Sequence, residues 1–445
     1  MSCLLLAYPL ASLFRRLPSD SPPTQKHLFS LLATGFMFLV VQGQWVGLGH
    51  ILLSSLVSYA LMAYAGDRAW APRAVFLFVM AHLSLTHIRR LNYDINNPPL
   101  DYSGAQMVLV IKLTTYAYNV FDGHRPDRAD PQALSARQRL KAVAYKPTLL
   151  EFLGFFAGPA FEFRDYTDFI SLEAFRRTPP PSGSSAGVNT DRGVVVPDSR
   201  PAAYRKLAAG LLGMVGVVLI TTRFPVPFML EPAYARLAFP VRLVYILLTC
   251  FGTRLPYYVA WLLAEGACVR AGLGFGGYWD QLTNVYPWRF ETGQNLKELL
   301  DAWNVATNHW LKHYIYLRLT PVGAKPTLTT TLSTFFVSAL WHGFFPGYYL
   351  AFMTISVMSN VARTLRRTIR PLAMYDVACW LLTQLALNYS ITPFMLLYWH
   401  DSIRAWQVNY FFGHVVLILI IAFYKLGGAG LLRPYHLVVS ARKAD

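Results

Sequence analysis

Long apolar runs separated by short polar segments dominate this chain. Several runs approach the ~20 consecutive apolar residues that a helix needs to cross a bilayer. They lie near residues 29–48, 50–66, 71–88, 104–121, 205–222, 240–268, 327–345, 347–362, 374–399 and 408–424. The apolar stretch 148–163 is shorter and contains Gly-Pro, so we expect it to be re-entrant. The pattern predicts an all-α polytopic membrane protein with about 10–12 transmembrane or re-entrant helices.

Two polar segments interrupt this pattern. Residues 175–206 are rich in Pro, Ser, Gly and Arg, which predicts a flexible solvent loop within a single integral membrane domain spanning 1–445. Residues 272–319 begin as a glycine-rich, aromatic stretch that we expect to be irregular. From about Asn295 the apolar residues recur at helical spacing, which predicts one helix lying against the bundle, with Asn304 at the edge of its apolar stripe. That stripe contains Leu296, Leu299, Leu300, Trp303, Trp310, Tyr314 and Leu317.

The composition agrees with a membrane protein and changes how the charge is interpreted. Hydrophobic residues make up 54% of the chain and charged residues 14%, against about 25% in soluble domains. The net charge of +17 would suggest nucleic acid in a soluble protein. Here the basic residues lie mostly in loops such as 125–146, as expected for positive-inside topology and anionic headgroups. We therefore expect no nucleic-acid partner, while attraction of a phosphate-rich cytosolic substrate stays open.

No metal site is expected from the histidines and cysteines. His309 and His313 have the spacing of the two histidines in HExxH zinc sites, but Trp310 occupies the position of the general-base Glu. No obvious third ligand follows. The four cysteines are scattered and form no CxxC pair, so they are read as small hydrophobic side chains.

One histidine stands out from its surroundings. In "FFVSALWHGFFPGYYLAF", His342 is the only histidine or charged residue between Lys325 and Arg363. Two interpretations of His342 are open. Its imidazole is bonded to a carbonyl in the protein core, or it lines a cavity at a helix break. The neighbouring Gly343, Pro346 and Gly347 favour the break, because irregular backbone at membrane depth is tolerated only around protein or water-filled cavities. Two acidic residues in another apolar stretch, Glu162 and Asp165, are either buried and paired or interfacial.

Several segments resemble a known family. "DAWNVATNHWLKHYIYLRL" followed by "STFFVSALWHGFFPGYYLAF" resembles the signature of the membrane-bound O-acyltransferase (MBOAT) family, and more narrowly its lysophospholipid acyltransferase branch. Further matches are "GYWDQLTNV", "AGPAFEFRDYTDF" and "LDYSGAQMVLVIKLTTYAYNVFDG". The resemblance covers about residues 80–425 and its motifs occur in the expected order.

The resemblance implies an MBOAT-like bundle around a central catalytic cavity, with His342 and Asn304 as the catalytic residues. It implies transfer of an acyl group from acyl-CoA to the free glycerol hydroxyl of a lysophospholipid, with no cofactor beyond this co-substrate. The remaining candidates for substrate binding are Trp341, Trp303, Tyr348, Glu162, Asp280, Lys297, Lys312 and Arg318. For the three basic residues, CoA phosphates and lipid headgroups are both open as partners.

The expected location is the endoplasmic reticulum membrane, which the final residues "RKAD" support by their likeness to a dilysine retrieval signal. Acylation of another lipid or of a protein by an MBOAT enzyme is the alternative function. A proton-coupled transporter that uses His342 as a relay is the rival from another class, but no internal repeat supports it. Headgroup preference, acyl chain and oligomeric state stay undetermined by the sequence.

Overall fold

The computed structural model describes residues 1–18, 21–92, 101–128, 130, 134–178, 188–189, 194–320, 324, 327–369, 375–428 and 430. Its first half contains α1 (Ser2–Phe14), α2 (Pro23–Phe36), η1 (Met37–Val41), α3 (Trp45–Ala65), α4 (Ala71–Arg90), α5 (Ser103–His124), α6 (Ala136–Lys141), α7 (Leu149–Gly154), α8 (Phe163–Ile170), α9 (Glu173–Arg177), β1 (Val188–Asn189), β2 (Val195–Val196) and α10 (Arg200–Arg223). Its second half contains η2 (Val226–Leu230), α11 (Pro232–Arg236), α12 (Phe239–Ala271), α13 (Pro287–Thr292), α14 (Leu296–Ala302), α15 (Val305–Trp310), η3 (Leu311–Tyr316), α16 (Leu317–Leu319), α17 (Leu328–His342), α18 (Pro346–Ile369), α19 (Tyr375–Leu396), α20 (Trp399–Val408) and α21 (Phe412–Lys425).

The predicted all-α class is confirmed, and the chain is a multi-pass membrane protein. Among the described residues, five helical segments are long and apolar enough to cross a bilayer: Pro23–Val41, Trp45–Ala65, Ala71–Arg90, Arg200–Leu230 and Phe239–Ala271. Together α20 and α21 pass the same test as a pair bent by 73°. This number is smaller than the predicted 10–12, which included re-entrant helices. Two of the predicted windows illustrate why. The helix α17 has only 15 residues and is too short to span, and the apolar run of α5 is interrupted by Lys112, Asn119 and Asp122.

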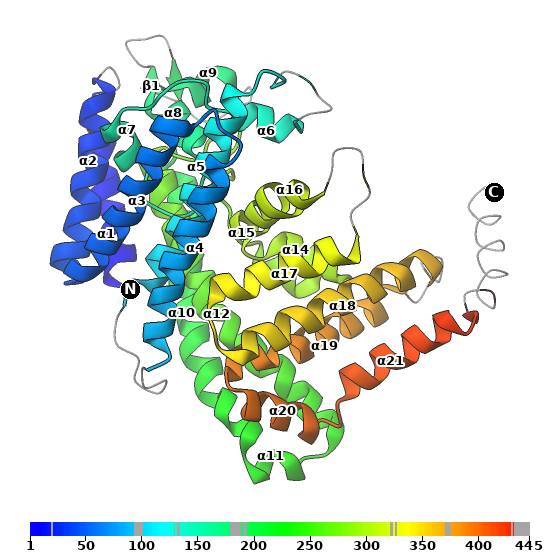
Figure 1. The fold of residues 1–445 in the computed structure, drawn as a ribbon. Coiled ribbons are helices and arrows are strands. Elements are labelled where there is room, and N and C mark those ends of the chain that lie inside the picture. Colours follow the sequence, from blue (N-terminus) through cyan, green and yellow to red (C-terminus); the bar gives the residue numbers. More distant parts are fainter. Residues whose placement is uncertain are drawn as a thin grey trace, which may run out of the picture. The chain divides into compact units, whose positions relative to one another are not determined.

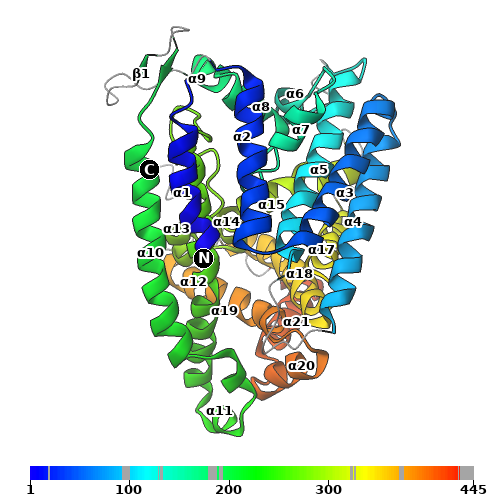
Figure 2. The same cartoon turned by 90° about the vertical axis from the view of Figure 1, so that its left-hand side faces the viewer.

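The chain forms two compact units, and each is built from several stretches of sequence. Unit 1 comprises residues 1–212, 258–284 and 306–326. Within it α3 packs on α4, α4 packs on α5 and α2 packs on α7. The long helices α2 to α5 run in blue to cyan in Figures 1 and 2. They place α5, whose side chains are mostly buried, inside the unit.

Part of the predicted solvent loop has defined packing in unit 1. Residues 179–187 and 190–193 lie outside the described residues, but β1 and β2 form an antiparallel pair with Val188 opposite Val196. Val194 and Val196 are buried against Phe175 and Phe275 in one apolar cluster. Apolar contacts therefore hold the end of this segment before α10 begins.

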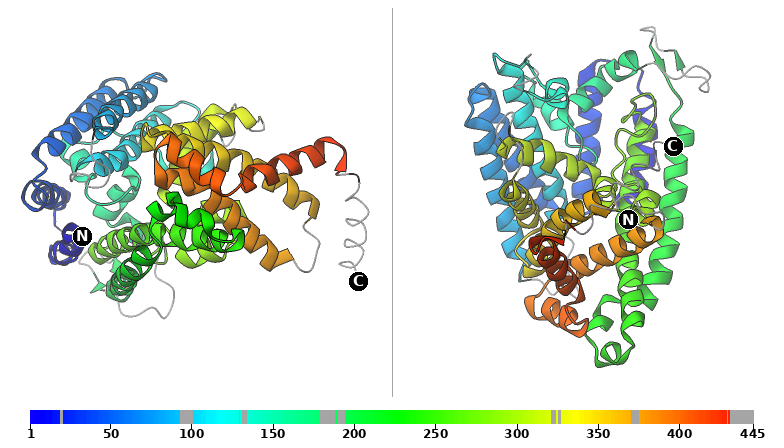
Figure 3. Two further views of the ribbon diagram at one scale, coloured as in Figure 1. Left: turned by 90° about the horizontal axis from the view of Figure 1, so that it is seen from below. Right: turned by 90° about the vertical axis from the view of Figure 1, so that its right-hand side faces the viewer.

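Unit 2 comprises residues 213–257, 285–305 and 327–445. Three consecutive helices pack together in this unit: α17 packs on α18, and α18 packs on α19. They are drawn in yellow and orange in Figures 1 and 3. In the same unit, α14 also packs on α18. A buried apolar cluster joins these helices, with Leu299 of α14, Ile355 of α18 and Leu387 of α19 among its members. The C-terminal "RKAD" lies outside the described residues.

Candidate functional site

His342 is the last residue of α17. The helix starts at Thr327, whose side-chain oxygen accepts a hydrogen bond from Thr330 N, as an N-cap residue does. It ends because Gly343 has φ = 126°, which favours glycine. Pro346 then opens α18 at a position that needs no backbone N–H donor. The predicted helix break beside His342 is confirmed.

Four aromatic rings surround the imidazole. Phe352 of α18 stacks on it with ring centroids 5.2 Å apart, and Phe394 of α19 meets it edge-on at 5.0 Å. The rings of Trp341 and Tyr348 lie at 4.7 and 5.6 Å. His342 is nevertheless only partly buried, whereas Trp341 and Tyr348 are buried. The packing fixes the ring and leaves part of it accessible, as a proton-transferring group requires.

Gly347 explains how Phe394 of α19 comes so near. The N–H of Gly347 donates to the carbonyl of Leu397 at 2.7 Å, joining the start of α18 to the end of α19. A Cβ on Gly347 would lie 2.0 Å from the Pro393 carbonyl oxygen. Only glycine permits this approach of the two backbones. Phe352 and Phe394 were not among the predicted site residues. The nearness of Phe394 to His342 depends on this contact between α18 and α19.

Asn304 lies at a second helix break, where the sequence predicts an uninterrupted helix. That prediction is wrong: α14 ends at Ala302, Trp303 is extended, Asn304 has φ = 44°, and α15 begins at Val305. Asn is one of the few residues that tolerate left-handed backbone. The apolar stripe continued across the break, and so the period alone did not reveal it. Leu296, Leu299, Trp310 and Tyr314 of the stripe are buried as expected.

Both breaks belong to unit 2, on elements that pack on the same helix. Trp303, beside Asn304, contacts the rings of Phe290 at 5.2 Å and Tyr257 at 5.7 Å. Trp303 and Phe335 of α17 pack on one apolar cluster. Because α14 and α17 both pack on α18, the two predicted catalytic residues lie on neighbouring elements of one unit.

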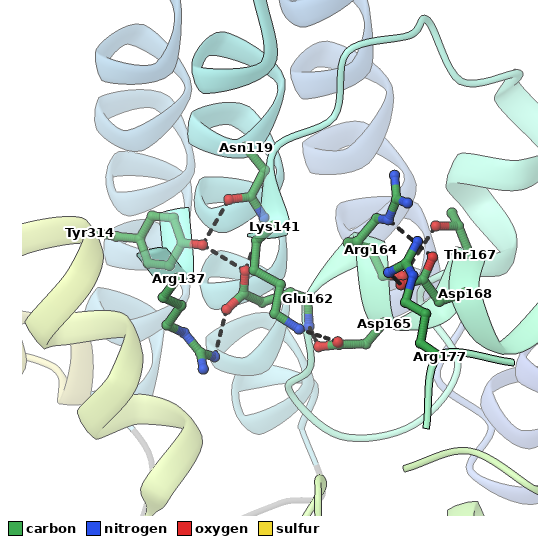
Figure 4. A network of polar contacts seen from close by, with 10 residues as sticks. All are labelled: Asn119, Arg137, Lys141, Glu162, Arg164, Asp165, Thr167, Asp168, Arg177 and Tyr314. Atoms are coloured by element: carbon green, nitrogen blue, oxygen red, sulfur yellow. Dashed lines mark hydrogen bonds and ion pairs between the residues drawn. The ribbon is translucent and has the colours of Figure 1, made fainter. Parts of the chain in front are cut away.

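Glu162 is a member of a polar network in unit 1, shown in Figure 4. One of its carboxylate oxygens accepts hydrogen bonds from Tyr314 OH at 2.7 Å and Asn119 Nδ2 at 3.1 Å. The other pairs with Arg137 at 2.7 Å. Burial and the neighbouring carboxylate raise the pKa of Tyr314 well above its ordinary value, so its hydroxyl keeps its proton. Of the two sequence alternatives, Glu162 is buried and paired, which favours a supporting role over direct contact with substrate.

The other predicted polar residues lie in varied surroundings. Asp165, half of the same acidic pair, forms an ion pair with Lys141. Arg318 makes two hydrogen bonds to the buried Asp122, at 2.9 and 2.5 Å. Lys297 pairs with Asp301 on the surface of α14, Lys312 is exposed on η3, and Asp280 is exposed in the irregular 272–286 segment. Arg318 is thus committed to a structural pair, whereas both lysines remain accessible.

Within the described part of the chain, no three histidine, cysteine or acidic side chains gather as metal ligands would. The rings of His309 and His313 are 6.2 Å apart, on α15 and η3. Burial, together with the nearby Arg137 and Lys312, lowers the pKa of His313 to about 4. His313 is therefore neutral at physiological pH.

Comparison with known proteins assigns the chain to a family. The family model for membrane-bound O-acyltransferases matches residues 31–390, a range that includes both helix breaks. The chain belongs to the membrane-bound O-acyltransferase family. O-acyl transfer is therefore its class of chemistry.

Curated relatives of this MBOAT protein match along most of their length. A Schizosaccharomyces pombe protein named lysophospholipid acyltransferase is 34% identical over 95% of this chain and 85% of its own length. A Saccharomyces cerevisiae protein of the same name is 32% identical over 93% of this chain and 72% of its own. The human membrane-bound glycerophospholipid O-acyltransferase 2 is 30% identical over 94% of this chain and 83% of its own.

Proposed function

We propose that this protein is a lysophospholipid acyltransferase of the endoplasmic reticulum, which moves a fatty acyl group from acyl-CoA to the free glycerol hydroxyl of a lysophospholipid. The relatives named lysophospholipid acyltransferase support the acceptor, because each matches nearly the whole of this chain. The observation that carries the chemistry is the partly accessible His342, set in four aromatic rings at a helix break.

His342 acts as a general base in this proposal. Its imidazole takes the proton of the glycerol hydroxyl as the hydroxyl oxygen attacks the thioester carbonyl. The C–S bond then breaks, and the CoA sulfur leaves with the proton that the imidazolium returns. Positioned acid–base catalysis of this kind contributes about 10²–10⁴-fold. The proposal includes no acyl-enzyme, since no activated Ser or Cys signature occurs in the sequence.

Asn304 supports the same step by donating its side-chain N–H to the developing oxyanion or to the imidazole. A single such donor is worth about 2.7–4 kcal/mol in other acyl-transfer enzymes. The accessible Lys297, in the same unit as His342, is the proposed contact for CoA phosphates. The surface ion pair of Lys297 with Asp301 is weak, about 0.3–0.5 kcal/mol for such helix pairs, so it exchanges readily for a phosphate.

The assay that tests substrate class offers purified protein a panel of lysophospholipids together with acyl-CoAs. Mass spectrometry should detect diacyl phospholipid products. Free fatty acid in place of acyl-CoA should give no product, because no energy source for the new ester bond is then present. Acylation of diacylglycerol, sterol or peptide, with no lysophospholipid accepted, would reject the assigned branch.

Replacing Asn304 tests the second catalytic group. Asn304→Gly and Asn304→Asp both tolerate the left-handed backbone, and neither offers an amide N–H. Both should lower kcat by about 10²-fold or more. Combined with His342→Ala, they should cause little additional loss, because residues that act as a unit are not additive. A folded Asn304→Gly protein with normal kcat would remove Asn304 from the mechanism.

A further inference from the structure

Two arginines of unit 1 lie where apolar helices end. Arg15 follows the last residue of the apolar helix α1, and Arg270 lies in the last turn of α12, which is long and apolar enough to cross a bilayer. We propose that Arg15 and Arg270 together bind the headgroup phosphate of an anionic membrane phospholipid. Both residues belong to unit 1, and the site is independent of the proposed roles of His342 and Asn304.

The two guanidinium groups are held close to each other. Arg15 Nη1 approaches the backbone of Gly272, two residues after Arg270, so closely that a Cβ added to Gly272 would lie 3.1 Å from this nitrogen. Gly272 has φ = 102°, which favours glycine, so the turn after α12 permits the approach. Burial and the positive charge of Arg270 both lower the pKa of Arg15. Two like charges therefore share one location.

This pair differs from the other half-buried arginines of unit 1. In the part of the chain that the structure describes, neither Arg15 nor Arg270 donates a hydrogen bond or joins an ion pair, and the Nε of Arg270 is buried without a partner. Both side chains are half-buried. A charge in such surroundings is costly unless it is paired, so the two arginines require an anion from outside the chain. The other described half-buried arginines of the unit each bind a carboxylate or a carbonyl: Arg90, Arg125, Arg137, Arg139, Arg164 and Arg318.

Asp198 is the acidic residue whose charge acts on Arg15, and its carboxylate is already bound. Each of its oxygens accepts from Arg200 Nε at 3.0 Å, and Arg200 Nη2 pairs with it at 2.9 Å. One carboxylate cannot balance the charges of three guanidinium groups. The surroundings of Arg15 and Arg270 therefore stay positive.

The chemistry of the pair fits a phosphate, and its location fits a lipid. A guanidinium is a planar fork that binds phosphate oxygens in pairs, and two adjacent forks can bind the oxygens of one phosphate. Basic residues at the ends of apolar helices lie at the level of the headgroups, where anionic lipids attract them. Packing holds the site in place, since Phe14 stacks on Phe169 with ring centroids 5.5 Å apart and Phe169 also lies against Gly272.

General attraction between a basic surface and anionic lipid is the competing explanation, and Arg16 is the matched control. Arg16 is the next residue in the chain and has the same charge, but its side chain is exposed. If only surface charge matters, Arg16→Gln should weaken the response to anionic lipid as much as Arg15→Gln does. If the half-buried pair forms a site, only Arg15→Gln should do so.

The experiment measures melting temperatures in nanodiscs of phosphatidylcholine alone and of phosphatidylcholine with phosphatidylglycerol. Phosphatidylglycerol should raise the melting temperature of the wild type by about 2–4 °C, because a ligand that binds only the folded protein stabilises it. Arg15→Gln and Arg270→Gln should each lose most of this shift, and the double variant should lose little more, since both forks bind one phosphate. Arg15→Lys keeps the charge without the fork and should retain only part of the shift. Arg16→Gln should keep all of it.

Native mass spectrometry gives a second measurement that does not depend on stability. The wild type and Arg16→Gln should retain a phosphatidylglycerol molecule that Arg15→Gln and Arg270→Gln lose. Inorganic phosphate and CoA are added separately to the phosphatidylcholine nanodiscs. If either one stabilises the wild type as much as phosphatidylglycerol does, and Arg15→Gln abolishes this effect, the site binds a soluble phosphate and the lipid assignment is overturned. Equal lipid responses of Arg15→Gln and Arg16→Gln, or a wild type that neither shifts nor retains phosphatidylglycerol, would also overturn it.

Discussion

His342→Ala should abolish acyl transfer, with a loss of at least about 10²–10⁴-fold, because the general base is gone. The imidazole packs among Phe352, Phe394, Trp341 and Tyr348, so alanine also leaves a void. His342→Gln fills more of the space without supplying a base of suitable pKa, and it should be equally inactive while better folded. Product formation read by mass spectrometry, together with the melting temperature, separates chemistry from stability.

His313→Ala is the control for this experiment. His313 is the neutral, partly buried histidine of unit 1 and belongs to neither helix break. Its variant should keep most of the activity. A monodisperse His342→Gln protein with near-normal turnover would eliminate the general-base role. If both His342 variants are inactive and only they are aggregated, His342 serves the fold rather than the reaction.

Gly347→Ala should lower acyl transfer nearly as much as His342→Ala does, but through a change in helix packing and not through loss of the general base. The added methyl would lie 2.0 Å from the Pro393 carbonyl oxygen and 2.9 Å from Leu397 backbone atoms, so the start of α18 must move away from α19. That movement breaks the Gly347–Leu397 hydrogen bond and withdraws Phe394 from His342. Overpacking of this kind costs typically 1–3 kcal/mol, and the clash here is with rigid backbone. We expect a clear drop in melting temperature and loss of most acyl transfer.

Gly49→Ala provides the matched comparison. Gly49 lies within α3, and an added Cβ there would meet no atom within 4 Å. Alanine in such a helical position is neutral or stabilising by up to about 1 kcal/mol. Activity of Gly49→Ala should stay at the wild-type level. Equal effects of the two glycine variants on activity would contradict the close-approach explanation.

The sequence predicted the elements whose causes are local. The break after His342 was predicted because Gly343 and Pro346 act on their own backbone, and the structure places it there. The five helical segments that are long and apolar enough to cross a bilayer overlap predicted windows for the same reason. The break at Asn304 was missed, since Trp303 and Trp310 keep the apolar period on both sides of it. The asparagine itself was the available signal, because Asn favours turns and helix starts.

Contacts between distant segments were beyond sequence reasoning. Nothing near Glu162 in the sequence indicates that Asn119 and Tyr314 bind its carboxylate, 43 and 152 residues away. The edge-on contact of Phe394 with His342 is of the same kind. Such contacts depend on the final packing of helices, which a single sequence does not specify residue by residue.

The discontinuity of unit 1 has a consequence for biosynthesis. Its stretches 1–212, 258–284 and 306–326 are separated by parts of unit 2. A ribosome delivers Glu162 long before Tyr314, so the carboxylate waits for a partner while about 150 residues are made, at roughly 5–20 residues per second. Unit 1 cannot be completed until residues 306–326 have been synthesised. Fragments that end before this point should be retained by quality control, and the gene cannot be divided into an N-terminal and a C-terminal half that fold alone.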